Sequence, residues 1–300
     1  MLIYSLTRYD CTMDIKQQLQ NRNQFKIKNF IDYSNFNNLI ITTPSDLGVI
    51  RNGGRRGSVY GPKAIINNFL NLTIDNNNKK NFNIVNCEQT YQTNFKNAQI
   101  DESNQISHFF NKTTDNIIQL GGGHDHIYPL ITSLFKTFDK IHVINIDAHL
   151  DTRTDSIHHS GTPFRQIFND ANKHKKSFFL SQIGIHAYCN QEDNFSNFDN
   201  RMQIIKMKDQ RLSKKLIKQD YLTILSLDVD GLDSSFMEAT SAVNHNGISK
   251  NDMNTLLDIY NSINQKLKVF GIYEYNPIYE NLSNRGAKFI SSLMYKFLSL

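Results

Sequence analysis

The sequence predicts one α/β domain built on a mostly parallel sheet with helices on both faces. Short apolar runs alternate along the chain with segments of helical periodicity, which is the pattern of repeated strand–helix units. The 300 residues show no internal repeat and no change of composition, so we expect a single domain over 1–300. A hydrophobic content of 39% can supply its core.

The predicted strands are the apolar runs, at residues 39–42, 82–86, 117–120, 141–146, 178–185, 222–227 and 269–275. A helix is expected to start near Pro62, after a glycine-rich turn. The clearest helix covers 250–266, because apolar residues recur there at helical spacing and Ser249 with Asp252 resembles a capping box. A final helix is expected over 282–298.

Three acidic clusters directly follow predicted strands. They are Gly-Gly-Gly-His-Asp at 121–125, Asp-Ala-His-Leu-Asp at 147–151 and Ser-Leu-Asp-Val-Asp at 226–230. Ligands of open parallel sheets gather at the carboxyl ends of the strands, so we expect the three clusters to meet there. If the chain stays extended past each strand, alternate side chains share one face, which would align the histidine and aspartates of each cluster.

Taken alone, His124 would more often be a hydrogen-bonded histidine in a glycine turn, and Asp228 with Asp230 could cap a helix. Three clusters after three strands favour a metal site instead. Four aspartates cannot share a small volume as anions without cations, so we expect a pair of divalent metal ions. The expected ligands are His124, Asp147, His149, Asp151, Asp228 and Asp230. Imidazole and carboxylate ligands suit Mn²⁺ or a similar ion, and such a pair activates water.

Composition argues against several classes of protein. The net charge of +5 is mild and its basic residues are dispersed, so we expect no nucleic-acid partner. No long apolar span is present, so we expect no membrane partner. Cys11, Cys87 and Cys189 show no Cys-x-x-Cys spacing and are expected to be buried, reduced thiols. With a start too short and polar for a signal peptide, these features favour a cytoplasmic protein, compatible with a homo-oligomer.

The three clusters, in this order, resemble the signatures of the ureohydrolase family, which contains arginase, agmatinase and formimidoylglutamase. The resemblance extends from Gly48 to Pro277. It implies an arginase-like, three-layer α/β/α domain with two Mn²⁺ ions per chain at the strand ends. By position, one ion would be held by His124, Asp147, Asp151 and Asp228. The other would be held by His149, Asp147, Asp228 and Asp230, so that Asp147 and Asp228 bridge the two.

Two further segments resemble the formimidoylglutamase branch. Residues 159–166 contain its Ser-Gly-Thr-Pro-Phe stretch, with Ser160 where arginases and agmatinases usually carry a histidine. Residues 48–62 resemble its Asn-x-Gly-Arg-x-Gly segment. His159 lies one place from the family's histidine and would become a proton-shuttle histidine if the register were shifted. The segment 271–277 matches the family stretch whose glutamate, here Glu274, faces the substrate's amidine or guanidine.

The resemblance implies hydrolysis of N-formimidoyl-L-glutamate to L-glutamate and formamide, a step of histidine degradation. Asp151 would hydrogen-bond the attacking hydroxide and pass its proton to the leaving nitrogen, and Glu274 would pair with the amidinium. This small substrate carries two carboxylates, for which the candidate binding residues are Arg153, Arg55, Arg165 and Ser160.

Two alternatives remain at this point. The first is a guanidine hydrolase of the arginase or agmatinase type, although agmatine lacks carboxylates and an arginine-lined pocket would repel it. The second is a non-catalytic, metal-binding regulator on the same fold. Retention of the six ligands and Glu274 argues against the regulator, because a scaffold does not need an open, charge-dense metal pair.

Overall fold

A computed structural model describes residues 26–74, 80–87, 94–110, 114–195, 198–205 and 216–300. Its centre is an eight-stranded sheet in the order β2-β1-β3-β8-β7-β4-β5-β6, in which every neighbouring pair is parallel. The strands are β1 (Asn38–Thr43), β2 (Phe82–Asn86), β3 (Asn116–Gly121), β4 (Lys140–Ile146), β5 (Ser177–Ile183), β6 (Met202–Ile205), β7 (Leu222–Asp228) and β8 (Lys268–Tyr273).

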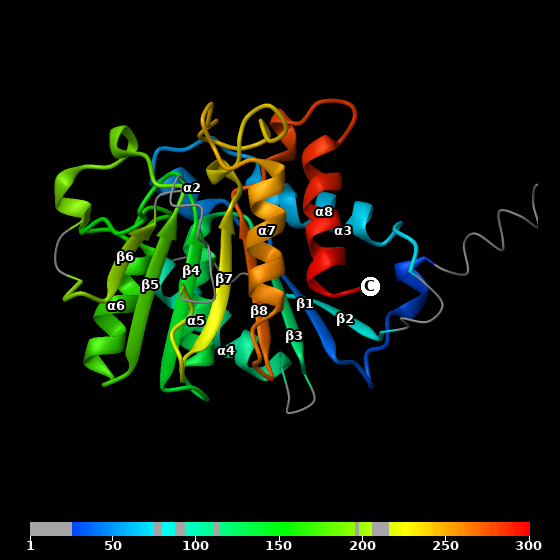
Figure 1. Ribbon diagram of the computed structural model, residues 1–300, viewed down its shortest axis with the longest axis horizontal. Helices are drawn as coiled ribbons and strands as arrows, with labels where there is room; N and C mark the ends of the chain where they lie inside the picture. The colour runs from blue at the N-terminus through cyan, green and yellow to red at the C-terminus, as the bar shows by residue number, and fades with distance from the viewer. Residues whose placement is uncertain (1–25, 75–79, 88–93, 111–113, 196–197, 206–215) are drawn as a thin grey trace, which may run out of the picture.

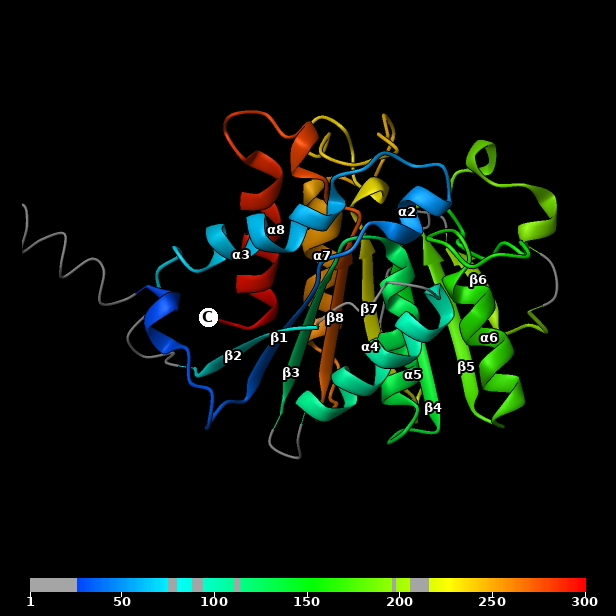
Figure 2. The same ribbon diagram turned by 180° about the vertical axis from the view of Figure 1, so that it is seen from behind.

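Helices cover both faces of the sheet. In Figure 1, α7 (Lys250–Asn261) and α8 (Arg285–Phe297) lie on the near face, and α3 (Gly61–Phe69) shares an apolar cluster with them. Figure 2 shows α4 (Phe95–Phe109), α5 (Ile127–Leu134) and α6 (Pro163–Lys173) on the opposite face, while the short α2 (Leu47–Arg51) lies at the end of the sheet. Each face has its own cluster of buried apolar side chains. The predicted three-layer α/β/α architecture is therefore confirmed.

The helix α7 begins where the sequence predicts it and ends earlier. The Ser249 hydroxyl accepts a hydrogen bond from the Asp252 amide at 3.2 Å and donates to the Asp252 carboxylate at 2.7 Å, so Ser249 caps the start of the helix. The helix buries Met253, Leu256, Leu257 and Tyr260 against the sheet. It ends at Asn261, and the predicted extension to 266 was wrong, because Ser262 closes the helix and the chain turns towards β8. The helices expected near Pro62 and over 282–298 are α3 and α8.

The predicted strands are all present, but two of them were predicted too long. The strand β5 ends before Gly184, whose φ of 92° turns the chain, and β8 ends before Glu274, whose φ is 65°. An additional strand, β6, was missed. It is a four-residue edge strand paired with β5, and so short a segment carries little periodicity.

The described thiols follow the prediction in part. Cys87 is free and buried, as predicted, whereas Cys189 is free but only partly buried. Cys11 and the polar start of the chain lie outside the described residues. No described helix is long and apolar enough to cross a membrane.

Parallel pairing places the carboxyl ends of all strands at one edge of the sheet, which we call the carboxyl edge; it is uppermost in Figure 1. The four central strands there are β3, β8, β7 and β4, which are neighbours in space although distant in sequence. The clusters that follow β3, β4 and β7, and the segment that follows β8, therefore reach the same place.

A buried histidine in β4 makes stability depend on pH. The Nε2 atom of His142 lies 2.8 Å from the Ser181 hydroxyl. Burial, with a smaller contribution from Lys218, lowers the pKa of His142 to about 3. Its unfolded pKa is about 6.5, so the unfolded chain binds this proton more readily. The stabilisation is complete above that value and is lost as the pH falls towards the folded pKa.

We expect His142→Gln to flatten the acid limb of the stability profile. Below about pH 6.5, the free energy of unfolding should change with pH less steeply in the variant than in the wild type, by up to about 1.4 kcal/mol per pH unit. Urea unfolding of the metal-free proteins measures this difference. His174→Gln, which changes an exposed histidine, is the control and should leave the slope unchanged. Equal slopes for wild type and His142→Gln would contradict the assignment.

Candidate metal centre

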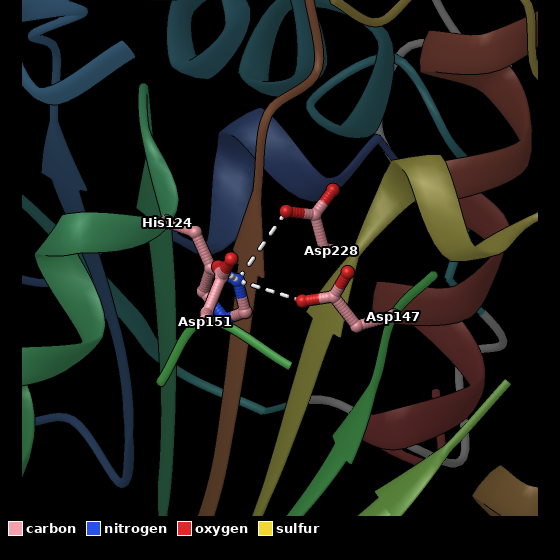
Figure 3. A group of neighbouring side chains, drawn as sticks. All are labelled: His124, Asp147, Asp151 and Asp228. Carbon is pink, nitrogen blue, oxygen red and sulfur yellow. Dashed lines mark ion pairs between the residues drawn. The ribbon is translucent and has the colours of Figure 1, made fainter. Parts of the chain in front are cut away.

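The first group of possible metal ligands surrounds His124. Its Nδ1 lies 3.1 Å from Asp147 Oδ2, 2.8 Å from Asp151 Oδ2 and 3.3 Å from Asp228 Oδ2. Figure 3 shows the three carboxylates arranged around this nitrogen, at the ends of β4 and β7. His124 is completely buried, and the aspartates are buried or nearly so. The group therefore offers one nitrogen and three carboxylates at a single point.

The second group consists of Asp147, His149 and Asp230. His149 Nδ1 lies 3.0 Å from Asp230 Oδ2 and 3.6 Å from Asp147 Oδ1. Asp147 belongs to both groups, as the resemblance implies for a bridging ligand. Asp228 belongs to the first group and meets Asp230 through the Asp230 amide, which donates to Asp228 Oδ1 at 2.9 Å. Its second bridging role stays a prediction.

The side chains converge through bends, not through the extended continuation that the sequence suggested. After β4 the chain turns: the Leu150 amide donates to Asn190 Oδ1 at 2.8 Å, and the Leu150 carbonyl accepts from Gln182 Nε2 at 2.7 Å. Asp151 then adopts a φ of 51°. After β7 the chain forms a 3₁₀ turn, η8 (Val229–Gly231), and a side chain at Gly231 would lie 2.8 Å from Asp147 Cα. Glycine thus allows the two ligand loops to touch.

Electrostatics within the groups favour cations. Burial, followed by Asp230 and Asp147, raises the pKa of Asp228, and burial raises the pKa of Asp230 to about 6 although His149 opposes the shift. His124 Nδ1 is buried and forms no hydrogen bond of acceptable geometry, although three carboxylates surround it. A buried imidazole nitrogen that faces three carboxylates fits metal coordination. The residues present therefore fit a pair of divalent ions.

A hydroxyl from β7 orients His124. Ser226 Oγ lies 3.0 Å from His124 Nε2, and both residues are fully buried. If Nδ1 binds a metal ion, Nε2 carries the proton and donates to this hydroxyl, which then fixes the ring and its tautomer. Ser226 was missed as a functional residue at the level of sequence. The alternation of β7 carried the signal, because Ser226 and Asp228 are two residues apart and share one face of the strand.

Glu274 lies beside the metal ligands. It is buried, its Oε1 accepts from the His124 amide at 3.0 Å, and its own amide donates to the Gly122 carbonyl at 2.8 Å. Its φ of 65° is rare for a residue with a side chain and is typical of functional sites. Burial is the main cause that raises the pKa of Glu274 to about 8, and Asp230 adds to it.

A cavity of about 300 Å³ opens onto both groups, and His149, Asp151, Asp228, Asp230 and Glu274 line it. It is also lined by Arg153, Asn52 and Ser160. Arg153 Nη1 donates to Asn52 Oδ1 at 2.7 Å, and Asn52 Nδ2 donates to Ser160 Oγ at 3.1 Å. Asn52 had received no individual role, although it stands in the Asn-x-Gly-Arg-x-Gly segment that the resemblance singled out.

Arg55 also lines the cavity, at its rim. Its guanidinium lies 3.9 Å from the centroid of the Tyr279 ring and donates to the carbonyls of Thr240 and Ser241 at 2.7 and 2.8 Å. The side chain is therefore held in place by protein contacts at the mouth of the cavity.

Two candidates from the sequence point elsewhere. Arg165 is buried, donates from Nε to the Thr152 carbonyl at 3.1 Å and stacks on Phe198, outside the cavity lining. The structure places Arg165 behind the loop at Thr152, and its predicted contact with substrate stays a prediction. His159 is likewise buried against Asp155, with 2.8 Å between Nε2 and Oδ2, and Ser160 lines the cavity in its place. A shuttle role for His159 is thus not supported.

The chain matches known proteins over most of its length. The model of the Arginase family matches residues 37–299. The formimidoylglutamase of Staphylococcus epidermidis is 29% identical over 266 residues, which cover 84% of this chain and 83% of that protein. The formimidoylglutamase of Hahella chejuensis is 27% identical over 281 residues, or 87% and 84% of the two chains.

Solved structures share the fold. The Trypanosoma cruzi formiminoglutamase with Mn²⁺ aligns with a TM-score of 0.75 and 21% identity, covering 89% of this chain and 94% of that one. The formimidoylglutamase of Bacillus subtilis aligns with a TM-score of 0.76 and 15% identity, covering 91% of each chain. At these identities the structural likeness supports the fold alone.

We expect Ser226→Ala to weaken metal binding about tenfold, because the His124 ring loses the partner that fixes its tautomer. Titration of metal-free protein with Mn²⁺ as the probe measures this. Ser133→Ala is the matched control, since Ser133 is also buried but donates to the Leu130 carbonyl of its own helix. Unchanged affinity in Ser226→Ala would mean that ring packing alone orients His124.

Proposed function

The chain belongs to the arginase family, and on that premise we propose that it is a dimanganese hydrolase that cleaves N-formimidoyl-L-glutamate to L-glutamate and formamide. The observation that carries the proposal is one cavity lined both by candidate metal ligands and Glu274 and by Arg153 and Arg55. The names of the curated relatives at 27–29% identity support the same substrate.

We propose the ligand roles that the resemblance implies. His124, Asp147, Asp151 and Asp228 would hold one Mn²⁺ ion. Asp147, Asp228, His149 and Asp230 would hold the other. When bound, such a pair lowers the pKa of water and supplies a nucleophile near neutral pH. The T. cruzi neighbour, which was crystallised with Mn²⁺, supports the choice of metal.

The chain's own residues would orient the substrate and move protons. Asp151 lies at the cavity wall, where its carboxylate can take a proton from the attacking water and give it to the departing nitrogen. Glu274 would pair with the planar amidinium and hold its carbon over the metal pair. Pairing requires the charged carboxylate of Glu274, whose pKa is raised in the metal-free protein. Metal cations and the amidinium nearby would lower that pKa and so favour the charged form.

The arginines give the substrate's two carboxylates their partners. Asn52 holds Arg153 on the wall of the cavity, and carbonyls hold Arg55 at its mouth. Both guanidinium groups are therefore preorganised, which reduces the entropy lost on binding a carboxylate. A diamine-type guanidine such as agmatine would bring a second positive charge towards them and be repelled.

The direct test is a side-by-side assay of purified, Mn²⁺-loaded protein. We expect turnover of formimidoylglutamate at a kcat/KM far above that for arginine, agmatine and guanidinobutyrate, with two Mn²⁺ ions per active chain by elemental analysis. Preferred turnover of arginine or agmatine would assign the chain to the guanidine-hydrolysing branch. Activity without a transition metal would reject the metal centre itself.

We expect Arg153→Ala to lower kcat/KM for formimidoylglutamate by the equivalent of about 2–4 kcal/mol, since a charge-assisted contact with a carboxylate, which an arginine can make in bidentate form, is lost. Steady-state kinetics measure it, with manganese content determined in parallel. Arg56→Ala is the matched control, because Arg56 is exposed and lies outside the cavity lining. Loss of manganese in Arg153→Ala would instead make Arg153 a support of the 147–151 loop.

A further inference from the structure

A tyrosine that takes no part in the proposed chemistry packs directly on a candidate metal ligand. The ring of Tyr273, the last residue of β8, stacks on the ring of His124 with 4.9 Å between centroids and 25° between planes. Phe164 meets His124 edge-on from another side, at 5.4 Å. Tyr273 is completely buried, so this contact is fixed within the interior and not at the surface.

Two glycines leave the space on the sheet that the Tyr273 ring occupies. A Cβ atom at Gly271 would lie 2.2 Å from the Tyr273 hydroxyl, and one at Gly121 would lie 2.5 Å from its Cδ1. Two adjacent strands, β8 and β3, thus lack a side chain where the ring lies flat along them. Any larger residue at either position would push the ring off His124.

The Tyr273 hydroxyl begins a chain of buried hydrogen bonds that leads away from the site. It donates to Gln119 Oε1 at 2.6 Å, and Gln119 Nε2 donates to Glu102 Oε1 at 3.2 Å. Glu102 belongs to α4, which covers the sheet, and is only 3% exposed. Burying a carboxylate this deeply costs folding free energy unless hydrogen bonds or an ion pair compensate for it, so its presence requires an explanation.

Glu102 has a second partner that leads back to the site. His126 Nδ1 lies 2.7 and 3.0 Å from the two Glu102 oxygens, and its Nε2 lies 3.2 Å from the Ser45 carbonyl. The same carbonyl accepts from the Gly123 amide at 3.0 Å, next to His124. We call Glu102, Gln119, His126 and Tyr273 the Glu102 network.

We propose that the Glu102 network positions His124 for metal binding, with Tyr273 as the member in contact. The branch through Gln119 fixes the plane of the Tyr273 ring, which stacks on His124. The branch through His126 fixes the backbone next to His124. Neither branch touches the cavity, so these are positioning residues and not catalytic ones. The inference rests on the proposed metal centre and is independent of the identity of the substrate.

The test measures Mn²⁺ affinity of the full-length, metal-free protein by following free Mn²⁺ with electron paramagnetic resonance. Tyr273→Phe keeps the stacked ring but removes its anchor, and Glu102→Gln keeps the shape of the side chain but removes its charge. We expect each to weaken Mn²⁺ binding about tenfold. Because both residues act through one network, the Mn²⁺ affinity of the double variant should be only slightly lower than that of the weaker-binding single variant.

Tyr260→Phe is the matched control. Tyr260 is equally buried, and its hydroxyl lies 3.0 Å from the Thr223 carbonyl and 2.9 Å from the Val269 carbonyl, near the start of those strands. Thermal unfolding of the metal-free variants should show comparable losses for both tyrosines, with Mn²⁺ affinity lowered only in Tyr273→Phe.

Three results would overturn the inference. In the first, Tyr273→Phe and Glu102→Gln bind Mn²⁺ as the wild type does, and only the inference fails. In the second, Tyr260→Phe weakens binding as much as Tyr273→Phe, which would make the effect one of general stability. In the third, the wild type binds no Mn²⁺ pair, and the proposed function fails as well. If Tyr273→Phe does not fold, Glu102→Gln alone decides between these results.

Discussion

The mutual repulsion of buried carboxylates is the constraint on which the rest of this structure depends. Asp147, Asp228 and Asp230 meet at the carboxyl edge of the sheet with almost no access to water, and their pKa values respond to one another. Such an arrangement is stable in its charged form only if cations are present. Metal binding is therefore coupled to the packing of the central strands, since neither ligand loop can relax without opening the sheet edge.

The backbone is strained at two carboxylate residues of this site. Asp151 and Glu274 both have positive φ, a conformation that costs non-glycine residues about 1–3 kcal/mol each. Hydrogen bonds hold them there: the Asp151 carbonyl accepts from the Phe164 amide at 3.1 Å, and Glu274 bonds to the loop that carries His124. These bonds preorganise both carboxylates at the cavity before substrate arrives, which is what electrostatic stabilisation of a transition state requires.

Much of the fold and the centre of the site could be predicted, because both follow from local patterns. Apolar runs gave the seven longer strands, and ligand residues placed just after them had to converge once the strands were parallel. The edge strand β6 was too short to show periodicity. The bends that aim Asp151 and Glu274 were invisible, since positive φ at aspartate or glutamate leaves no mark in the sequence. Tyr273 and Glu102 were missed because their contacts join residues far apart in the chain.

The candidate metal ligands and the arginines of the cavity are held by different kinds of contact. The ligands lie at or just after the ends of β3, β4 and β7, where most of them are buried. Arg55 lines the same cavity from the segment between α2 and α3, and it is exposed and held by backbone carbonyls. Exposed loops tolerate substitution far better than buried segments, so the charge at Arg55 can change while the ligand groups stay intact. Arg153 differs, because it follows Asp151 by two residues and lies in the loop of that candidate ligand, so a change there can act on both parts of the cavity.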